Sequence, residues 1–163
     1  MKKLLIFIII AAMISANAFA IETVGEETLT VPVPSALLME KTSGEVIYEK
    51  NAHEKMAPAS VTKIMTMLLV MEEVEAGRLS ENDKVVCSSY AASMGGSQIW
   101  LEEGETMTVH EMLKAVAVVS ANDCAVALAE HISGSEGSFV AKMNTRAAEL
   151  GMNDTHFVDC TGL

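Results

Sequence analysis

A serine and a lysine three residues apart stand near the start of an apolar run at residues 58–71, which reads PASVTKIMTMLLVM. Lys63 is the only charged residue in this run, and Ser60 precedes it. Residues three apart lie on one face of a helix, so both side chains are expected to project together from the first helical turn. A serine hydroxyl becomes a nucleophile only when a base within hydrogen-bond reach takes its proton.

Lys63 is the candidate for that base. A free lysine amine titrates at about 10.4, but burial among apolar side chains penalises the charged form and lowers the pKa. The free N–H groups and positive dipole end of the helix N-terminus favour negative charge at Ser60 and disfavour a protonated neighbour. The alternative is structural: Ser60 caps the helix and Lys63 extends its amine to water. The S-x-x-K pattern alone does not decide between these two interpretations.

A second group of short polar residues, Ser120-Ala121-Asn122, lies at a predicted break between two helices. Ser120 would relay a proton between Lys63 and a leaving group, and Asn122 would hydrogen-bond an amide of the substrate. The structural alternative is that Ser120 and Asp123 simply begin the next helix. S-x-x-K followed by S-D-N opens the motif series of penicillin-binding proteins and class A β-lactamases, and here Ala121 replaces the aspartate.

The order of the predicted elements indicates an α+β fold, because strands come first and a block of helices follows. The apolar runs at residues 36–39 and 46–48 are expected to form a β-hairpin. A helix is expected at 58–77, apolar on all sides and therefore buried. The elements expected after it are a strand from 84, helices at 108–120, from 122 and at 139–150, and a strand beginning at 155.

Trp100, directly after a glycine-rich loop, is expected to pack against the protein rather than to stack on a substrate.

The N-terminus has the three parts of a secretory signal peptide in residues 1–20. It begins with two lysines, continues with an apolar stretch at residues 4–14, and ends in an A-x-A cleavage signal. A transmembrane anchor is the alternative, but the apolar stretch is short for a span of ~20 residues. Both interpretations place the rest of the chain outside the cytoplasm, where residues 21–34 are expected to form an irregular lead-in arm.

Charge and cysteine content exclude further classes. The formal net charge is −11, and removing the two signal lysines leaves about −13, which argues against a basic nucleic-acid surface. The remaining chain is long enough for one core at about 100–200 residues per domain.

The cysteines Cys87, Cys124 and Cys160 are odd in number and widely spaced, so they are predicted to be buried free thiols rather than a disulfide framework.

On these motifs the chain resembles the D-alanyl-D-alanine carboxypeptidases of the low-molecular-mass penicillin-binding type, serine peptidases of family S11. Three blocks are similar to family blocks and follow in family order: VIYEKNAHEKMAPASVTKIMT, GGSQIWLEEGETMTVHEMLKAVAVVSANDCAVALAE and FVAKMNTRAAELGMNDTHFVDCTGL. The resemblance implies a β-lactamase/DD-peptidase-like fold, with a mixed sheet, a helical subdomain and an active site between them. Residues 35–163 would be the N-terminal part of that catalytic domain.

The resemblance also implies an activity and roles for four residues. The reaction is removal of the terminal D-alanine from peptidoglycan stem peptides that end in D-Ala-D-Ala, through an acyl-enzyme, and β-lactam antibiotics would acylate the same serine. Ser60 would be the acylated nucleophile, Lys63 its general base, and Ser120 the proton relay. Asn122 would bind the substrate. No metal, organic cofactor or nucleic-acid partner is expected.

The family's third motif, K-T-G or a variant, is not found. In the family it lies on a later strand that binds the substrate carboxylate. The KTSG at residues 41–44 precedes Ser60 and has an extra serine, and the CTGL at the end lacks the lysine. We therefore expect an N-terminal portion of a longer protein, truncated before the final strands and inactive or nearly so by itself. Membrane association would be possible through a missing C-terminal segment.

Three other classes are alternatives to a carboxypeptidase. A class A β-lactamase needs a glutamate that activates the deacylating water, and the only acid to consider, Glu149, lacks the flanking pattern. A non-catalytic wall-binding or penicillin-sequestering protein of the same fold would not need the intact motif residues. A zinc protease is excluded because Lys114 stands where H-E-x-x-H requires its second histidine, and Glu111 is better explained as the capping partner of Thr108.

Overall fold

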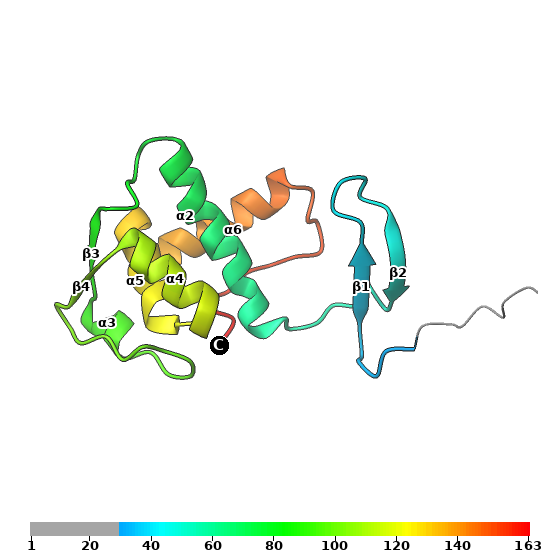
Figure 1. Ribbon diagram of the computed structural model, residues 1–163, viewed down its shortest axis with the longest axis horizontal. Helices are drawn as coiled ribbons and strands as arrows, with labels where there is room; N and C mark the ends of the chain where they lie inside the picture. Colours follow the sequence, from blue (N-terminus) through cyan, green and yellow to red (C-terminus); the bar gives the residue numbers. More distant parts are fainter. Residues whose placement is uncertain (1–29) are drawn as a thin grey trace, which may run out of the picture. The chain divides into compact units, whose positions relative to one another are not determined.

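The structure is a computed structural model, and it describes residues 30–163. The predicted signal peptide and most of the lead-in arm lie outside the described residues, and residues 30–34 of the arm contain neither helix nor strand. The described chain divides between Glu54 and Lys55 into two units (Figure 1). In this part of the chain no helix is both long and apolar enough to span a bilayer.

The first unit is the predicted β-hairpin. Strand β1 (Ala36–Met39) pairs antiparallel with strand β2 (Val46–Lys50). The carboxylate of Glu40 accepts hydrogen bonds from the backbone N–H groups of Thr42, at 2.8 Å, and Ser43, at 2.5 Å. An acidic side chain that binds backbone two and three residues ahead stabilises a tight turn. The K-T-S-G stretch is therefore the turn of this hairpin.

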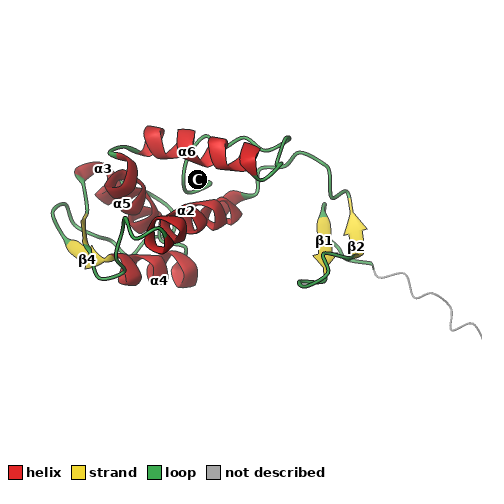
Figure 2. Ribbon diagram, turned by 90° about the horizontal axis from the view of Figure 1, so that it is seen from above, coloured by secondary structure: helices red, strands yellow, loops and turns green. Residues whose placement is uncertain are grey.

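The second unit consists of helices with a small two-stranded sheet. Its elements are the 3-10 helix η1 (Ala59–Thr62), α2 (Lys63–Glu75), β3 (Lys84–Val86), α3 (Ser89–Ala92), β4 (Thr106–Thr108), α4 (Val109–Val119), α5 (Asn122–Ser133) and α6 (Glu136–Glu149). Strands β3 and β4 pair antiparallel, and helices α2 and α5 lie between α4 and α6 (Figure 2).

Helix α5 occupies the centre of this unit because its side chains are mostly small. Residues 121–129 are all buried, and α5 contacts α2, α3, α4, α6 and β3. Alanine side chains let the surrounding helices approach closely, and larger side chains fill the remaining space. Phe139, Met143, Met112 and Val70 are fully buried there, and burial of such a side chain is worth roughly 1.5–3 kcal/mol.

Local signals in the sequence set the start of α4 and the ends of α4 and α6 as predicted, whereas α6 begins at Glu136, before the predicted start at Phe139. The Thr108 hydroxyl accepts from the Glu111 backbone N–H at 3.1 Å, and the Glu111 carboxylate accepts from the Thr108 N–H at 2.8 Å, which completes the capping box. Helix α4 ends at Val119, with Ser120 as its left-handed C-cap, and Gly151 follows α6 with a φ of 75°. A residue in the left-handed region ends a helix in this way.

The prediction for residues 58–77 is correct in position and wrong in two details. The α-helix begins only at Lys63, because η1 occupies the residues before it. The helix is not buried on all sides, since Ile64 is 62 % exposed and Met71 is 44 % exposed. An apolar composition therefore did not indicate which faces of this helix have neighbours.

The strand expected from residue 155 is not formed. The Phe157 N–H donates to the side-chain carbonyl of Asn144 at 2.8 Å, and the Asn144 amide donates to the Phe157 carbonyl at 2.9 Å. These bonds satisfy the backbone of Phe157 from α6, without a partner strand.

The expectation that Trp100 packs against the protein is wrong, because this residue is 75 % exposed.

The cysteines are buried free thiols, as predicted. Burial raises the pKa of Cys87, and it raises the pKa of Cys124 to about 12. Both thiols are therefore protonated at neutral pH and act as small apolar side chains in the core.

Candidate active site

The elements η1 and α2 bring the serine and the lysine of the first motif together. Ser60 is exposed, whereas Lys63 is only 3 % exposed, and the Lys63 Nζ lies 3.3 Å from the Ser60 Oγ. Ser60 lies in a 3-10 helix, where side chains three residues apart eclipse each other. The pair therefore meets although the α-helix begins only at Lys63. Ser60 makes no capping hydrogen bond, which contradicts the structural alternative.

The surroundings of Lys63 shift its amine towards the neutral form. Burial lowers the pKa of Lys63, while Cys160 and Asp159 act in the opposite direction without reversing the shift. The Lys63 Nζ also donates to the backbone carbonyl of Thr161 at 2.8 Å. A neutral amine keeps N–H groups for that carbonyl and has a lone pair for the Ser60 proton.

The last residues of the chain, 159–163, lie against the start of α2 (Figure 1). The Thr66 hydroxyl donates to the Cys160 carbonyl at 2.7 Å. Gly162 has a φ of +74°, and a Cβ there would overlap the carbonyl oxygen of Ala59. Only glycine accepts both the conformation and the close approach. This segment thus supplies a wall of the Lys63 site, a role that the sequence pattern did not indicate.

Ser120 lies at the predicted break between α4 and α5. It adopts a left-handed conformation, with φ 61° and ψ 37°, and its hydroxyl is buried with no hydrogen-bond partner among residues 30–163. An unpaired buried hydroxyl is uncommon and is often found at functional positions. The structure has no hydrogen bond between Ser120 and Lys63, so the predicted relay contact is not made in this state.

Asn122, the first residue of α5, binds the glycine-rich loop before it. Its Nδ2 donates to the Gly95 carbonyl and its backbone N–H to the Ser97 carbonyl, both at 2.7 Å. Its Oδ1 is buried and has no partner in the described part of the chain, which leaves an acceptor for a substrate N–H. A Cβ on Gly96 would lie 2.9 Å from the Asn122 Nδ2 and 3.0 Å from the Leu163 Cδ1. The loop therefore links Asn122 to the segment beside Ser60.

Asp123 holds this loop in place, a role that we did not predict from the sequence. Its carboxylate is completely buried and accepts from the backbone N–H groups of Ile99 and Leu101, both at 3.1 Å. Trp100 lies between these two donors with a φ of 58°, an unusual conformation that neighbouring contacts must maintain. The sequence signal was a carboxylate inside the apolar run NDCAVALA, because a buried carboxylate requires donors.

Glu149, the acid weighed for a β-lactamase, is the last residue of α6. Its side chain is 58 % exposed and pairs with Arg146 of the same helix at 3.1 Å. No hydrogen bond in the described part of the chain connects it to the motif residues.

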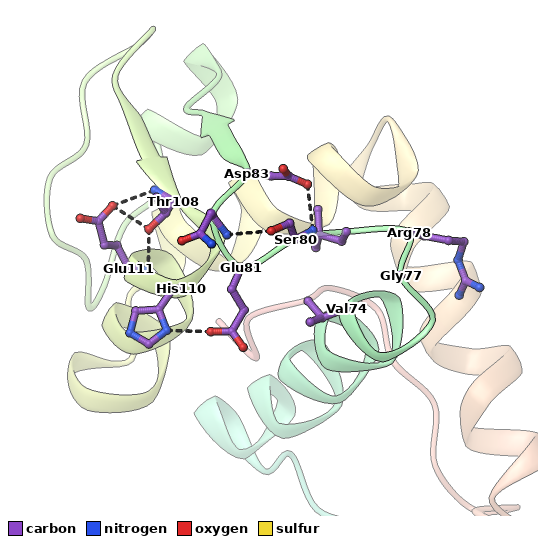
Figure 3. A pocket seen from close by; sticks show the side chains of 11 residues that line it. Val74, Gly77, Arg78, Ser80, Glu81, Asp83, Thr108, His110 and Glu111 are labelled. Carbon is purple, nitrogen blue, oxygen red and sulfur yellow. Dashed lines mark hydrogen bonds and ion pairs between the residues drawn. The ribbon is translucent and has the colours of Figure 1, made fainter.

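A surface hollow between the end of α2 and the start of α4 includes His110 and Glu111, the first two residues of the pattern that resembles H-E-x-x-H (Figure 3). There the His110 Nδ1 lies 3.0 Å from a carboxylate oxygen of Glu81. None of the four predicted site residues lines this hollow. Residues 30–163 contain no group of three or more His, Cys, Asp or Glu side chains arranged to hold a metal ion. The hollow is lined by Val74, Gly77, Arg78, Leu79, Ser80, Glu81, Asn82, Asp83, Thr108, His110 and Glu111.

Known proteins share both the sequence and the fold of this chain. The carboxypeptidase DacF of Bacillus subtilis strain 168 is 52 % identical over 168 residues, which cover 100 % of this chain and 43 % of the relative. Two of the solved structures that are similar to this chain each match 83 % of it. DacD of Francisella tularensis, 33 % of which is covered, has a TM-score of 0.81 at 39 % identity. Penicillin-binding protein D2 of Listeria monocytogenes, solved with ampicillin and 54 % covered, has a TM-score of 0.68 at 32 % identity.

The chain thus spans less than half the length of its Bacillus relative. The structural likenesses confirm the predicted α+β, DD-peptidase-like fold. The model of the D-alanyl-D-alanine carboxypeptidase family matches residues 22–163, nearly the whole chain. This chain therefore belongs to the D-alanyl-D-alanine carboxypeptidases, peptidase family S11.

Proposed function

We propose that the protein is a serine-type D-Ala-D-Ala carboxypeptidase that removes the terminal D-alanine from peptidoglycan stem peptides. One observation carries the proposal: the exposed Ser60 hydroxyl lies 3.3 Å from the buried amine of Lys63, whose pKa burial lowers. Membership of the family supports the substrate class. The ampicillin-bound relative supports binding of β-lactams.

Acylation begins with the hydroxyl of Ser60. As its Oγ attacks the carbonyl carbon of the D-Ala-D-Ala amide, the hydroxyl proton passes to the neutral amine of Lys63. The amide C–N bond then breaks, and a proton returns from the Lys63 ammonium through the Ser120 hydroxyl to the departing D-alanine nitrogen. The N–H groups at the start of the helix favour the negative charge that develops meanwhile. Asn122 binds the amide of the stem peptide with its free Oδ1.

Deacylation uses the same groups in reverse. Lys63 takes a proton from a water molecule, which attacks the ester carbonyl, and the ester oxygen of Ser60 leaves with that proton. The products are the shortened stem peptide and the free serine. A β-lactam enters the first half of this cycle, but its leaving nitrogen stays tethered to the acyl group, so the acyl-enzyme persists. The steps are acyl and proton transfers, and we propose no metal or organic cofactor for them.

The substrate places the protein outside the cytoplasm. Export by the signal peptide at residues 1–20 is therefore part of the proposal, and so is action at the cell wall or at the outer face of the cytoplasmic membrane. Membrane association through a further segment would keep the enzyme near newly made peptidoglycan.

Mass spectrometry of the whole protein after treatment with benzylpenicillin tests the proposal. We expect one covalent penicillin adduct per chain, on the peptide that contains Ser60. Protein unfolded in urea is the control, because its serine has no base beside it and should not react. Absence of an adduct on the folded protein would favour the non-catalytic alternative. Rapid turnover of penicillin without an accumulated adduct would favour a β-lactamase.

A further inference from the structure

The turn behind Lys63 contains a carboxylate that the mechanism above does not use. The Asp159 Oδ1 accepts from the Thr161 backbone N–H at 2.7 Å, from the Thr161 hydroxyl at 3.0 Å and from the Gly162 N–H. These bonds fold residues 159–162 into a tight turn. The turn directs the Thr161 carbonyl at the Lys63 Nζ, 2.8 Å away. The carboxylate therefore fixes the carbonyl that holds the amine.

Asp159 also carries the charge in this turn. Burial acts to raise the pKa of Asp159, but the hydrogen bonds from Gly162 and Thr161 together outweigh it, so the pKa is lowered and the side chain is a carboxylate at neutral pH. Cys160 is the other titratable group that acts on the Lys63 amine. Burial, followed by the effect of Glu136, raises the pKa of Cys160 far above its ordinary range, so this thiol is neutral.

The other elements around Lys63 contribute no further charge at the amine in the part of the chain that the structure describes. Helix α6 presents Glu136 behind Cys160, and that carboxylate accepts from the Cys160 N–H at 3.1 Å and from the Tyr90 hydroxyl at 2.7 Å. The η1 helix presents the neutral hydroxyl of Ser60. The ionised group that acts on the Lys63 amine is therefore Asp159.

We propose that Asp159 is a positioning residue for Lys63: its hydrogen bonds direct the Thr161 carbonyl at the amine, and they place an ionised carboxylate in the turn that binds the amine. A general base works best when its pKa lies near the working pH. Burial alone makes the amine a weaker base, and the adjacent carboxylate partly restores its proton affinity. The kinetic consequence depends on the proposed function, whereas the effect on the titration of Lys63 does not.

Two substitutions separate the charge of Asp159 from its hydrogen bonds. Asp159→Asn keeps an acceptor oxygen and removes the charge, whereas Asp159→Ala removes both. Asp154→Asn is the matched control, because this acid also lies near the end of the chain but its side chain is 86 % exposed and pairs with Lys55. Each variant is made in the whole protein. The readouts are NMR titration of ¹³Cε-labelled lysine and the pH dependence of acylation by penicillin.

For Asp159→Asn we expect Lys63 to lose its proton at a lower pH than in the wild type, because the ammonium has lost its counter-charge. The low-pH limb of the acylation profile then moves to lower pH, and the rate at a fixed pH on that limb rises about threefold to tenfold. The plateau stays within about threefold of the wild type, because the turn is kept. For Asp159→Ala the limb moves the same way, but the plateau falls about tenfold or more because the carbonyl is no longer directed.

A titration of Lys63 that is unchanged or moves to higher pH in folded Asp159→Asn would overturn the proposal. So would an equal shift in Asp154→Asn. If Asp159→Asn does not fold, Asp159→Glu replaces it: it keeps the charge and moves the acceptor, so the limb should stay in place while the plateau falls, and a limb at lower pH would count against the proposal. A wild type that penicillin does not acylate, with the Lys63 shift intact, refutes the proposed function and leaves this inference standing.

Discussion

Replacement of Lys63 by alanine should slow acylation of Ser60 by penicillin about a thousandfold at neutral pH. The Lys63 amine is the group within hydrogen-bond distance of the Ser60 hydroxyl, and it is buried and held by the Thr161 carbonyl. Without it, the serine must lose its proton to water. The rate constant for adduct formation, followed by mass spectrometry of quenched samples, measures the effect.

Two further lysine variants make this test specific. Lys63→Arg should be as inactive as Lys63→Ala, because a guanidinium stays protonated in proteins and cannot act as a base. Lys55→Ala is the control, since this exposed lysine pairs with Asp154 on the surface, and its loss should change the rate less than about twofold. Circular dichroism establishes that each variant is folded. Acylation of folded Lys63→Ala within about tenfold of the wild type would contradict the assignment of Lys63 as the base.

Replacement of Asp123 by alanine should lower the free energy of unfolding by about 3 kcal/mol. The change leaves the N–H groups of Ile99 and Leu101 without the carboxylate that accepts from them. It also creates a cavity beside α5, where Asp123 is completely buried. Urea unfolding followed by circular dichroism gives the stability. Hydrogen exchange at Ile99 and Leu101 should become faster, because these two amides lose their acceptor.

Asp83→Ala is the matched control for Asp123. Asp83 also accepts from a backbone N–H, that of Ser80 at 2.8 Å, but it lies at the surface, where water replaces the lost acceptor. Its removal should cost less than about 1 kcal/mol. An equal loss of stability in the two variants would show that burial of the Asp123 carboxylate carries no special weight.

Features that depend on neighbouring residues could be predicted from the sequence. The capping box of Thr108 and Glu111 and the stop at Gly151 follow from side chains and backbone within a few residues. The meeting of Ser60 and Lys63 was predicted for an α-helix and is found across a 3-10 turn, because a spacing of three residues brings side chains together in both.

Features that depend on distant contacts could not be predicted. The Lys63 amine binds a carbonyl 98 residues away, and no local pattern indicates such a contact. The strand expected from residue 155 was wrong for the same reason, since Asn144 of α6 binds the backbone of Phe157. The role of Asp123 depends on the path of the loop at residues 95–101, which only the folded structure shows.

The central claim is that the buried amine of Lys63 is neutral often enough to take the proton of Ser60. NMR titration of ¹³Cε-labelled lysine in the folded whole protein, with Lys63→Ala to assign the signal, tests it most directly. We predict that Lys63 loses its proton at a clearly lower pH than the lysines of the urea-unfolded chain, which should titrate at about 10.4. A Lys63 signal that titrates together with the unfolded lysines would contradict the claim.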